Sequence, residues 1–308
     1  MAAYQIKRIL VAVDFSGLSL NALETAAAIA RRQLATLTLL HIAESRYAVA
    51  APVPGAADAV IGPELLSAAN ENLSDLARKI RIKHDLVVHH FVQAGDAASE
   101  ISRWSADRFD LIVMGAKEQP DVWGAFLGST AYAVVMKSAC PVLTVPGTGL
   151  YTEFDKVLFP IRPIPHTLDK YDFIKPVIQK NSSSVIVAGI VRKGDEAGFA
   201  EMRSLVDYVR ARVEEEQVAC RTEVHYCTDI AEQVVTMANA ESPDLLVITA
   251  TSEQSWRDYF VGAFTQRIVS RSHCPVLSIR PDLDGGQGVL LRPVMDLLDI
   301  PHWQPSLT

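Results

Sequence analysis

The sequence predicts an α/β fold of two tandem, doubly wound domains, each with a five-stranded parallel sheet. Short apolar runs rich in β-branched residues alternate with longer amphipathic stretches, and one such unit recurs later in the chain. This alternation is typical of parallel sheets with helical crossovers, whose strands are buried on both faces. With 308 residues, the chain is long enough for two domains that each have a core.

The repeated unit consists of a buried strand, a loop containing glycines, a helix and a second strand. We predict the strand at 110–115, the helix at 128–138 and the next strand at 140–145. The unit recurs farther along in one unbroken register, which predicts a tandem duplication. The matched residues are Asp110, Leu111, Val113, Ala116, Phe126, Gly128, Val135, Ser138, Cys140, Pro141, Val142 and Leu143, which recur as Asp244, Leu245, Val247, Ala250, Phe260, Gly262, Val269, Ser272, Cys274, Pro275, Val276 and Leu277.

The first domain is expected to begin with a strand at 9–13, where five apolar residues follow one another. Ser16 or Ser19 is the expected N-cap of the helix after it, because a hydroxyl accepts from the free N–H groups of a first turn. That helix ends near Gln33 and is followed by a strand at 36–42, which is rich in leucine and threonine.

A stretch rich in alanine, proline and glycine, 48–62, separates this strand from a helix at 63–84. Pro63 suits the first turn of that helix, where no backbone donor is needed. A strand at 86–92 and a short helix at 97–105 precede the repeated unit, with Gly95-Asp96 as turn and cap between them.

The second domain repeats this order with fewer residues. Its first strand is predicted at 157–161, its second at 185–190, a helix at 201–216 and a further strand at 220–226. The spacing between matched residues is smaller at the end of the repeat than at its start, which fits loss of the 48–62 stretch.

We therefore divide the chain into a first domain at 1–147, a second at 151–281 and a C-terminal tail at 282–308. The linker is Gly147-Thr148-Gly149. The tail belongs to neither repeat and is rich in apolar residues, so we expect it to pack against a domain or a partner subunit.

Composition narrows the class of protein. Hydrophobic residues make up 49% and charged residues 21%, and the net charge is −7. This acidic balance argues against a nucleic-acid binder, and no apolar run has the length of a membrane span. None of the four cysteines forms a Cys-x-x-Cys pair, and the first residues lead directly into a core strand. We therefore expect a reduced, cytoplasmic protein without a leader peptide.

Three residues at the ends of predicted strands point to a ligand site. Asp14, Ile42 and Gly115 follow or end strands of the first domain, and ligands of parallel α/β sheets bind beyond the carboxyl ends of the strands. The loop between Gly115 and Gly128 leads into the N-terminus of a helix. Backbone N–H groups and the helix dipole favour an anion such as a phosphate there.

These motifs resemble the universal stress protein family in its tandem-domain form, across the chain to about residue 280. The matching pieces are the first strand with Asp14, Leu39-Leu40-His41-Ile42, Val113-Met114-Gly115, Gly128-Ser129 and Cys140-Pro141-Val142-Leu143. The resemblance implies an adenine-nucleotide α-hydrolase-like fold that usually dimerises. It also implies ATP as a ligand, since ATP-binding members carry Gly-x2-Gly-x9-Gly-Ser/Thr.

Carried over by position, Gly115 and Gly128 are the first and last glycines of that motif, and Ser129 is its hydroxyl. The resemblance places Asp14, Ile42 and Met114 around the adenosine. The expected binding residues are Ala12, Asp14, Ile42, Met114, Gly115, Gly128, Ser129 and Thr130. The second glycine is replaced by Glu118, whose carboxylate repels a triphosphate. Two interpretations of Gly115 and Gly128 stay open, nucleotide binding and tight helix–strand packing.

The second domain departs further from the motif. Thr249 stands in the place of Gly115, Ala263 in that of Ser129 and Arg162 in that of Asp14. We predict that this domain does not bind ATP in the family manner and serves in pairing or regulation. Binding of some other anion by Arg162 or Arg257 stays open, and the favoured expectation for both is a solvated surface arginine.

No catalytic or metal-ligating constellation is present in the sequence. The eight histidines lack metal-ligand spacing, and His41 is expected to be a hydrogen-bonded packing residue.

The favoured hypothesis is a stress-response protein that binds ATP, with magnesium, as a regulatory ligand of its first domain. The alternative is a scaffold that binds a partner and no nucleotide. An enzyme is the weakest hypothesis, with slow ATP hydrolysis as the most we expect.

The last strand of each domain is a predicted sheet edge. Pairing of 142–145 with 276–279 inside one chain would cover both exposed hydrogen-bonding ladders. We predict such an internal pseudo-dimer, and a homodimer of whole chains stays open.

Overall fold

The computed structural model describes residues 4–44, 62–106, 108–117, 129–147, 149–162, 167–168, 170–250 and 263–280. Strands and helices alternate along these ranges, as the sequence predicts. The strands are β1 (Arg8–Ala12), β2 (Thr36–Ala43), β3 (Val88–Ala94), β4 (Leu111–Gly115), β5 (Val142–Val145), β6 (Lys156–Ile161), β7 (Ser184–Arg192), β8 (Cys220–Cys227), β9 (Leu245–Thr249) and β10 (Val276–Ile279). The helices are α1 (Gly17–Gln33), α2 (Pro63–His84), α3 (Ala97–Ser105), α4 (Ser129–Lys137), α5 (Lys170–Asn181), α6 (Glu196–Glu215), α7 (Ile230–Glu241) and α8 (Ala263–Arg271).

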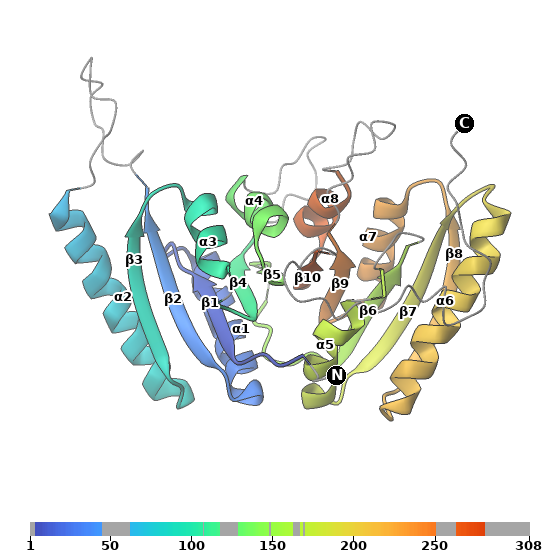
Figure 1. The fold of residues 1–308 in the computed structure, drawn as a ribbon, viewed down its shortest axis with the longest axis horizontal. Coiled ribbons are helices and arrows are strands. Elements are labelled where there is room, and N and C mark those ends of the chain that lie inside the picture. The colour runs from blue at the N-terminus through green and yellow to red at the C-terminus, as the bar shows by residue number, and fades with distance from the viewer. Residues whose placement is uncertain are drawn as a thin grey trace, which may run out of the picture.

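The ten strands form one continuous sheet in the order β3-β2-β1-β4-β5-β10-β9-β6-β7-β8. Strands β1 to β5 form the first half of the molecule and β6 to β10 the second, side by side in a curved arc (Figure 1). Neighbouring strands within each half are parallel. The halves meet where β5 and β10 pair antiparallel, with Leu143 opposite Leu277. This pairing confirms the predicted contact between the two terminal strands.

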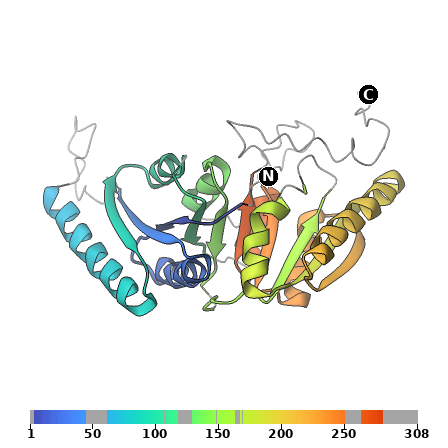
Figure 2. The same ribbon diagram turned by 60° about the horizontal axis from the view of Figure 1, so that its bottom comes forward.

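Helices cover the sheet on both faces and divide the core into two layers (Figures 1 and 2). One layer lies under α1, α2, α5 and α6, and the other under α3, α4, α7 and α8. Successive residues of a strand alternate between them, since Ile9 and Val11 face the first layer and Leu10 faces the second. Burial on both faces is the reason why these strands appear as uninterrupted apolar runs in the sequence.

The repeated aspartates have equivalent structural roles in the two halves. Asp110 Oδ2 accepts hydrogen bonds from the backbone N–H groups of Lys7 and Arg8, at 2.9 and 2.8 Å. Asp244 Oδ2 accepts one from the backbone N–H of Lys156 at 2.8 Å. Each carboxylate thus satisfies donors at the start of the first strand of its half, which accounts for the recurrence of aspartate before β4 and β9.

Side chains also link the two halves outside the sheet. Gln33 Nε2 donates to the carbonyl of Pro176 at 2.9 Å, and Arg32 Nη2 lies 3.2 Å from Glu153 Oε1. The Thr144 hydroxyl donates to the carbonyl of Val276 at 3.2 Å, beside the β5–β10 pairing.

Within the described ranges, the model contains no helix with the length and apolar character that crossing a membrane requires. The predicted tail at 282–308 lies outside these ranges, and the division into domains at 147 and 151 stays a prediction.

Candidate functional site

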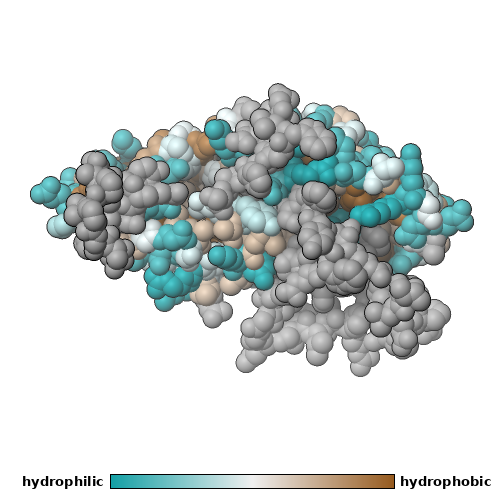
Figure 3. All heavy atoms as spheres, turned by 90° about the horizontal axis from the view of Figure 1, so that it is seen from above, coloured by the Kyte–Doolittle hydropathy of each residue, from teal (hydrophilic) through white to brown (hydrophobic). Residues whose placement is uncertain are grey.

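A cavity of about 650 Å³ opens at the carboxyl ends of β1, β2 and β4 in the first half. This is the point where strand order reverses, because β1 lies between β2 and β4 while the chain runs from β1 to β2. The first turns of α1, α3 and α4 and one side of α2 complete the wall. Such a location and size are typical of small-molecule sites in α/β proteins. Figure 3 looks down on this side of the molecule, where pale brown side chains lie between teal ones on the left half.

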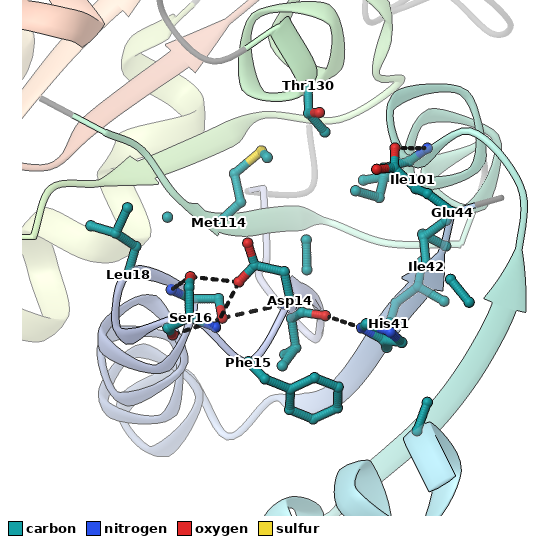
Figure 4. A pocket seen from close by; sticks show the side chains of 18 of the residues that line it. Asp14, Phe15, Ser16, Leu18, His41, Ile42, Glu44, Ile101, Met114 and Thr130 are labelled. Atoms are coloured by element: carbon teal, nitrogen blue, oxygen red, sulfur yellow. Dashed lines mark hydrogen bonds between the residues drawn. The ribbon is translucent and has the colours of Figure 1, made fainter. Parts of the chain in front are cut away.

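Six of the eight predicted binding residues line this one cavity, namely Ala12, Asp14, Ile42, Met114, Gly115 and Thr130. Ser129 is the first residue of α4, next to Thr130. Gly128 lies outside the described residues, as do Glu118 and Arg257. Figure 4 shows that the labelled residues come from separate elements and surround a common space.

The loop after β1 holds Asp14 in a fixed position. Asp14 Oδ1 accepts hydrogen bonds from the backbone N–H and the hydroxyl of Ser16, and the Ser16 hydroxyl oxygen accepts from the backbone N–H of Ser19 at 3.2 Å. Ser16 is therefore the N-cap of α1, as predicted. Partial burial raises the pKa of Asp14, but the hydrogen bonds from Ser16 and Ser19 outweigh it and lower the pKa below 3.8. The carboxylate is thus ionised at neutral pH.

An aromatic pair forms the wall beside Asp14. The rings of Phe15 and His41 lie 4.7 Å apart, centroid to centroid, with 43° between their planes (Figure 4). His41 Nδ1 donates to the carbonyl of Val13 at 2.7 Å, which confirms its prediction as a hydrogen-bonded packing residue. Phe15 has φ of 63°, a left-handed conformation that costs a residue with a side chain about 1–2 kcal/mol. Strain of this kind is concentrated at functional sites.

Two charged residues of the cavity wall were not among the eight expected binding residues. Glu44, just after β2, accepts a hydrogen bond through Oε1 from the backbone N–H of Ala97 at 3.3 Å, at the start of α3. Lys117, two residues after the end of β4, also lines the cavity. Both come within two residues of a strand end, which is the signal that would have identified them.

Gly115 has a packing role as well as a place in the wall. A Cβ atom on Gly115 would lie 2.8 Å from the backbone carbonyl carbon of Leu18 and 2.9 Å from its oxygen. β4 approaches the first turn of α1 so closely that a side chain would clash with backbone. The presence of glycine at position 115 is therefore, by itself, no evidence for a ligand.

In the second half, the residues that match Asp14 and Thr130 of the first half pack against each other. Arg162, in the position of Asp14, is only 7% exposed, and its Nη2 donates to the carbonyl of Thr249 at 3.1 Å. Its guanidinium carbon lies 3.7 Å from the ring centroid of Phe264, which matches Thr130 in the repeat. The prediction of a solvated Arg162 is wrong, because stacking on an aromatic face and a carbonyl acceptor stabilise it when buried.

A second buried cation lies close to Arg162. Lys170 Nζ donates to the carbonyl of Pro160 and lies 4.6 Å from the centroid of the Phe159 ring. Burial, and then the neighbouring charge of Arg162, lower the pKa of Lys170 well below 10.5. The two side chains make this part of the second half a packed interior.

A sequence model of the universal stress protein family matches residues 5–146 and 177–280. The chain belongs to this family. The unmatched interval contains β6, Arg162 and the start of α5, which is where the second half departs most from the repeat. Membership accounts for the adenine-nucleotide α-hydrolase-like fold of both halves.

Curated relatives align with about half of this universal stress protein. It is 28% identical over 140 residues to universal stress protein MJ0531 of Methanocaldococcus jannaschii, covering 45% of this chain and 81% of that one. It is 29% identical over 147 residues to universal stress protein YxiE of Bacillus subtilis, covering 45% and 97%.

Solved structures extend the likeness to both halves. A universal stress protein from Archaeoglobus fulgidus superposes with a TM-score of 0.72 at 18% identity, covering 90% of this chain and all of that one. A protein of unknown function from Pseudomonas aeruginosa gives a TM-score of 0.61 at 18% identity, covering 90% and 93%. At such identities, these likenesses show that the fold is shared.

Proposed function

We propose that this universal stress protein binds an adenine nucleotide in the cavity of its first half, as a regulatory ligand. The observation that carries the proposal is the convergence of six predicted binding residues on one cavity of about 650 Å³. The cavity lies at the reversal of strand order, where α/β sheets bind their ligands.

The wall offers what each part of a nucleotide requires. Ile42 and Met114 supply apolar surface and the Phe15–His41 pair supplies aromatic surface, both of which suit the faces of a purine. The Asp14 carboxylate accepts hydrogen bonds from an exocyclic amine or from ribose hydroxyls. Thr130 in the first turn of α4 lies where backbone donors and the helix dipole favour a phosphate.

The second half takes no nucleotide in this proposal, because Arg162 and Phe264 fill the equivalent place. We assign no catalytic residue, and ATP with magnesium is a ligand here, not a rapidly hydrolysed substrate. The cytoplasmic location and a homodimer of whole chains stay predictions.

Titration calorimetry of the full chain with adenine nucleotides, with and without magnesium, tests the proposal. We expect saturable binding that Thr130→Glu weakens by about tenfold or more, since the added carboxylate stands where the phosphate would lie. An acidic residue in a first turn favours the helix, so α4 is expected to stay folded. Gln266→Glu adds the same charge to the first turn of α8 and is the matched control.

Two results would contradict the proposal. Absence of heat and of a thermal shift with every adenine nucleotide at millimolar concentration would leave the scaffold hypothesis as the better one. Equal weakening by Thr130→Glu and Gln266→Glu would place the nucleotide elsewhere.

A further inference from the structure

We propose that Asn72 of α2 hydrogen-bonds the base of the bound nucleotide and selects adenine over guanine and hypoxanthine. This inference rests on the proposed function and assigns the two ends of the cavity to two parts of the ligand. It follows from the residues that α2 contributes to the wall, from the hydrogen-bonding capacity of Asn72 and from the positions of α2 and α4.

The first turns of α2 present to the cavity a face that differs from the one buried in the core. Four residues at the i, i+3, i+4 and i+7 spacing of one helix face line the cavity, namely Leu65, Ala68, Ala69 and Asn72. The residues of α2 that are buried in the core are Leu73, Ala77 and Ile80. With 3.6 residues per turn, the two sets point in directions about 100° apart. The cavity face is therefore not a continuation of the core face and is available to a ligand.

Asn72 is the polar member of this apolar face. Leu65 is 55% exposed and, with Ala68 and Ala69, offers surface on which the flat face of a base can lie. Asn72 is exposed too, and within the described part of the chain its carboxamide has no hydrogen-bond partner. A carboxamide is uncharged and has both donors and an acceptor. A nucleobase also presents donors and acceptors without a charge, so it is the part of a nucleotide that this end of the cavity suits.

The two ends of the cavity lie over different strands. α2 packs against β2 and β3 at the outer end of the first half, whereas α4 packs against β5, nearer the middle of the molecule (Figure 1). β1 lies between β2 and β4, which are therefore about 10 Å apart, or two strand spacings. A ribose separates base and phosphate on this scale. The base then lies at Asn72, the phosphate at Thr130, and the ribose hydroxyls at Asp14, just after β1.

Adenine matches a carboxamide better than the other two purines do. Along one edge adenine has an N6 amine that donates and an N7 that accepts, and a carboxamide forms a hydrogen bond with each. Guanine and hypoxanthine have two acceptors, O6 and N7, along that edge. The carboxamide can donate to only one of these, and its own oxygen then faces an acceptor and stays unpaired, which is unfavourable.

Titration calorimetry of the full chain with ATP, ITP and GTP, each with magnesium, tests the inference. The three ligands carry the same phosphates and differ in the base, so the ratios of their Kd values report contacts to the base. We expect ATP to bind at least about tenfold more tightly than ITP or GTP, within the discrimination that one bidentate pair gives. Asn72→Ala should weaken ATP binding by about tenfold, change ITP binding far less and bring the ratio of the two Kd values close to one.

Asn70→Ala is the matched control, because Asn70 is an exposed asparagine of the same helix and is not part of the cavity wall. It should keep the wild-type ratio of the Kd values for ATP and ITP. Alanine is the better helix former, so both variants are expected to stay folded. Thr130→Glu acts at the phosphate, so it should weaken all three ligands alike and also keep the ratio.

Three results would overturn the inference and leave nucleotide binding in the cavity standing. These are equal binding of ATP, ITP and GTP by the wild type, an unchanged ratio in Asn72→Ala, and the same change of ratio in Asn70→Ala. Failure of all three ligands to bind would overturn the proposed function, and this inference with it.

Discussion

The presence of glycine at position 115 is explained equally well by ligand binding and by close packing of a strand on a helix. Gly115 lines the cavity and it also allows β4 to approach the backbone of Leu18. We expect Gly115→Ala to lower the free energy of unfolding by about 1–3 kcal/mol, the usual cost of forcing extra atoms into a packed site.

Denaturant unfolding of the full chain measures this effect. Gly17→Ala is the control, since a Cβ there would meet no atom within 4 Å. Gly17 is the first residue of α1, where alanine is the better helix former. Equal stability changes in the two variants would show that β4 and α1 are not in close contact at Gly115.

Single residues also mark where sequence reasoning succeeded and failed. Asp14, Ile42 and Gly115 were placed at a common site because each follows or ends a strand, and strand ends of parallel sheets converge. Arg162 was misjudged because its burial depends on Phe264 and Thr249, which lie far along the chain. A charged side chain is usually solvated, and only the three-dimensional contacts reveal the exception.

At the scale of elements, the ion pairs between α1 and α2 predict a dependence on pH. Lys83 Nζ lies 2.7 Å from Glu24 Oε1, and His84 Nε2 lies 2.9 Å from Oε2. Burial raises the pKa of Glu24, but hydrogen bonds from Lys83 and His84 outweigh it and lower the pKa below 4.5. The Glu24 carboxylate therefore binds a proton less readily in the folded state than in the unfolded state. Its stabilising contribution to the free energy of unfolding is present above pH 4.5 and is lost as the pH falls through the lowered pKa.

We therefore expect Glu24→Gln to destabilise the protein at pH 7 and to flatten the loss of stability between about pH 5 and pH 3. Chemical unfolding followed at a series of pH values measures both effects. Glu71→Gln, at an exposed position of α2, is the control and should keep the slope of the wild type. An unchanged acid slope in Glu24→Gln would show that another carboxylate dominates.

Elements with strong local signals were predicted closely. The bounds of α2 and α3 are those expected, because Pro63 and Asp96 mark their starts. Other bounds shifted for identifiable reasons. α6 begins at Glu196, five residues before the predicted start, because Asp195 accepts from the backbone N–H of Gly198 and caps it. The pattern predicted no bounds for α5, whose interior Pro176 is normally a helix breaker.

At the scale of the whole molecule, β5 and β10 join the halves into a single sheet. We expect the halves to stay associated after cleavage at a protease site introduced within 147–149, since the β5–β10 pairing and the Gln33–Pro176 hydrogen bond join the two fragments without that peptide bond. Light scattering of the cleaved protein measures the association.

Leu277→Lys would place a charge in the buried centre of this pairing, opposite Leu143. The cleaved variant is expected to separate into halves, while the uncleaved variant keeps the mass of one chain. Halves of the wild type that separate on cleavage alone would show that the linker, and not the sheet, holds them together.

Because one chain joins two unequal halves, the dependence of ligand occupancy on ligand concentration differs from that of a pair of identical chains. A symmetric pair of identical chains must carry two equal sites, and equal sites can cooperate. Here Arg162 packs against Phe264 at the equivalent positions of the second half, so the function proposed above assigns one nucleotide site to each chain. In a monomeric chain, occupancy of that one proposed site would rise hyperbolically with ligand concentration, with a Hill coefficient of one. Under the proposed function, such a chain would respond gradually over about two decades of ligand concentration and without a threshold.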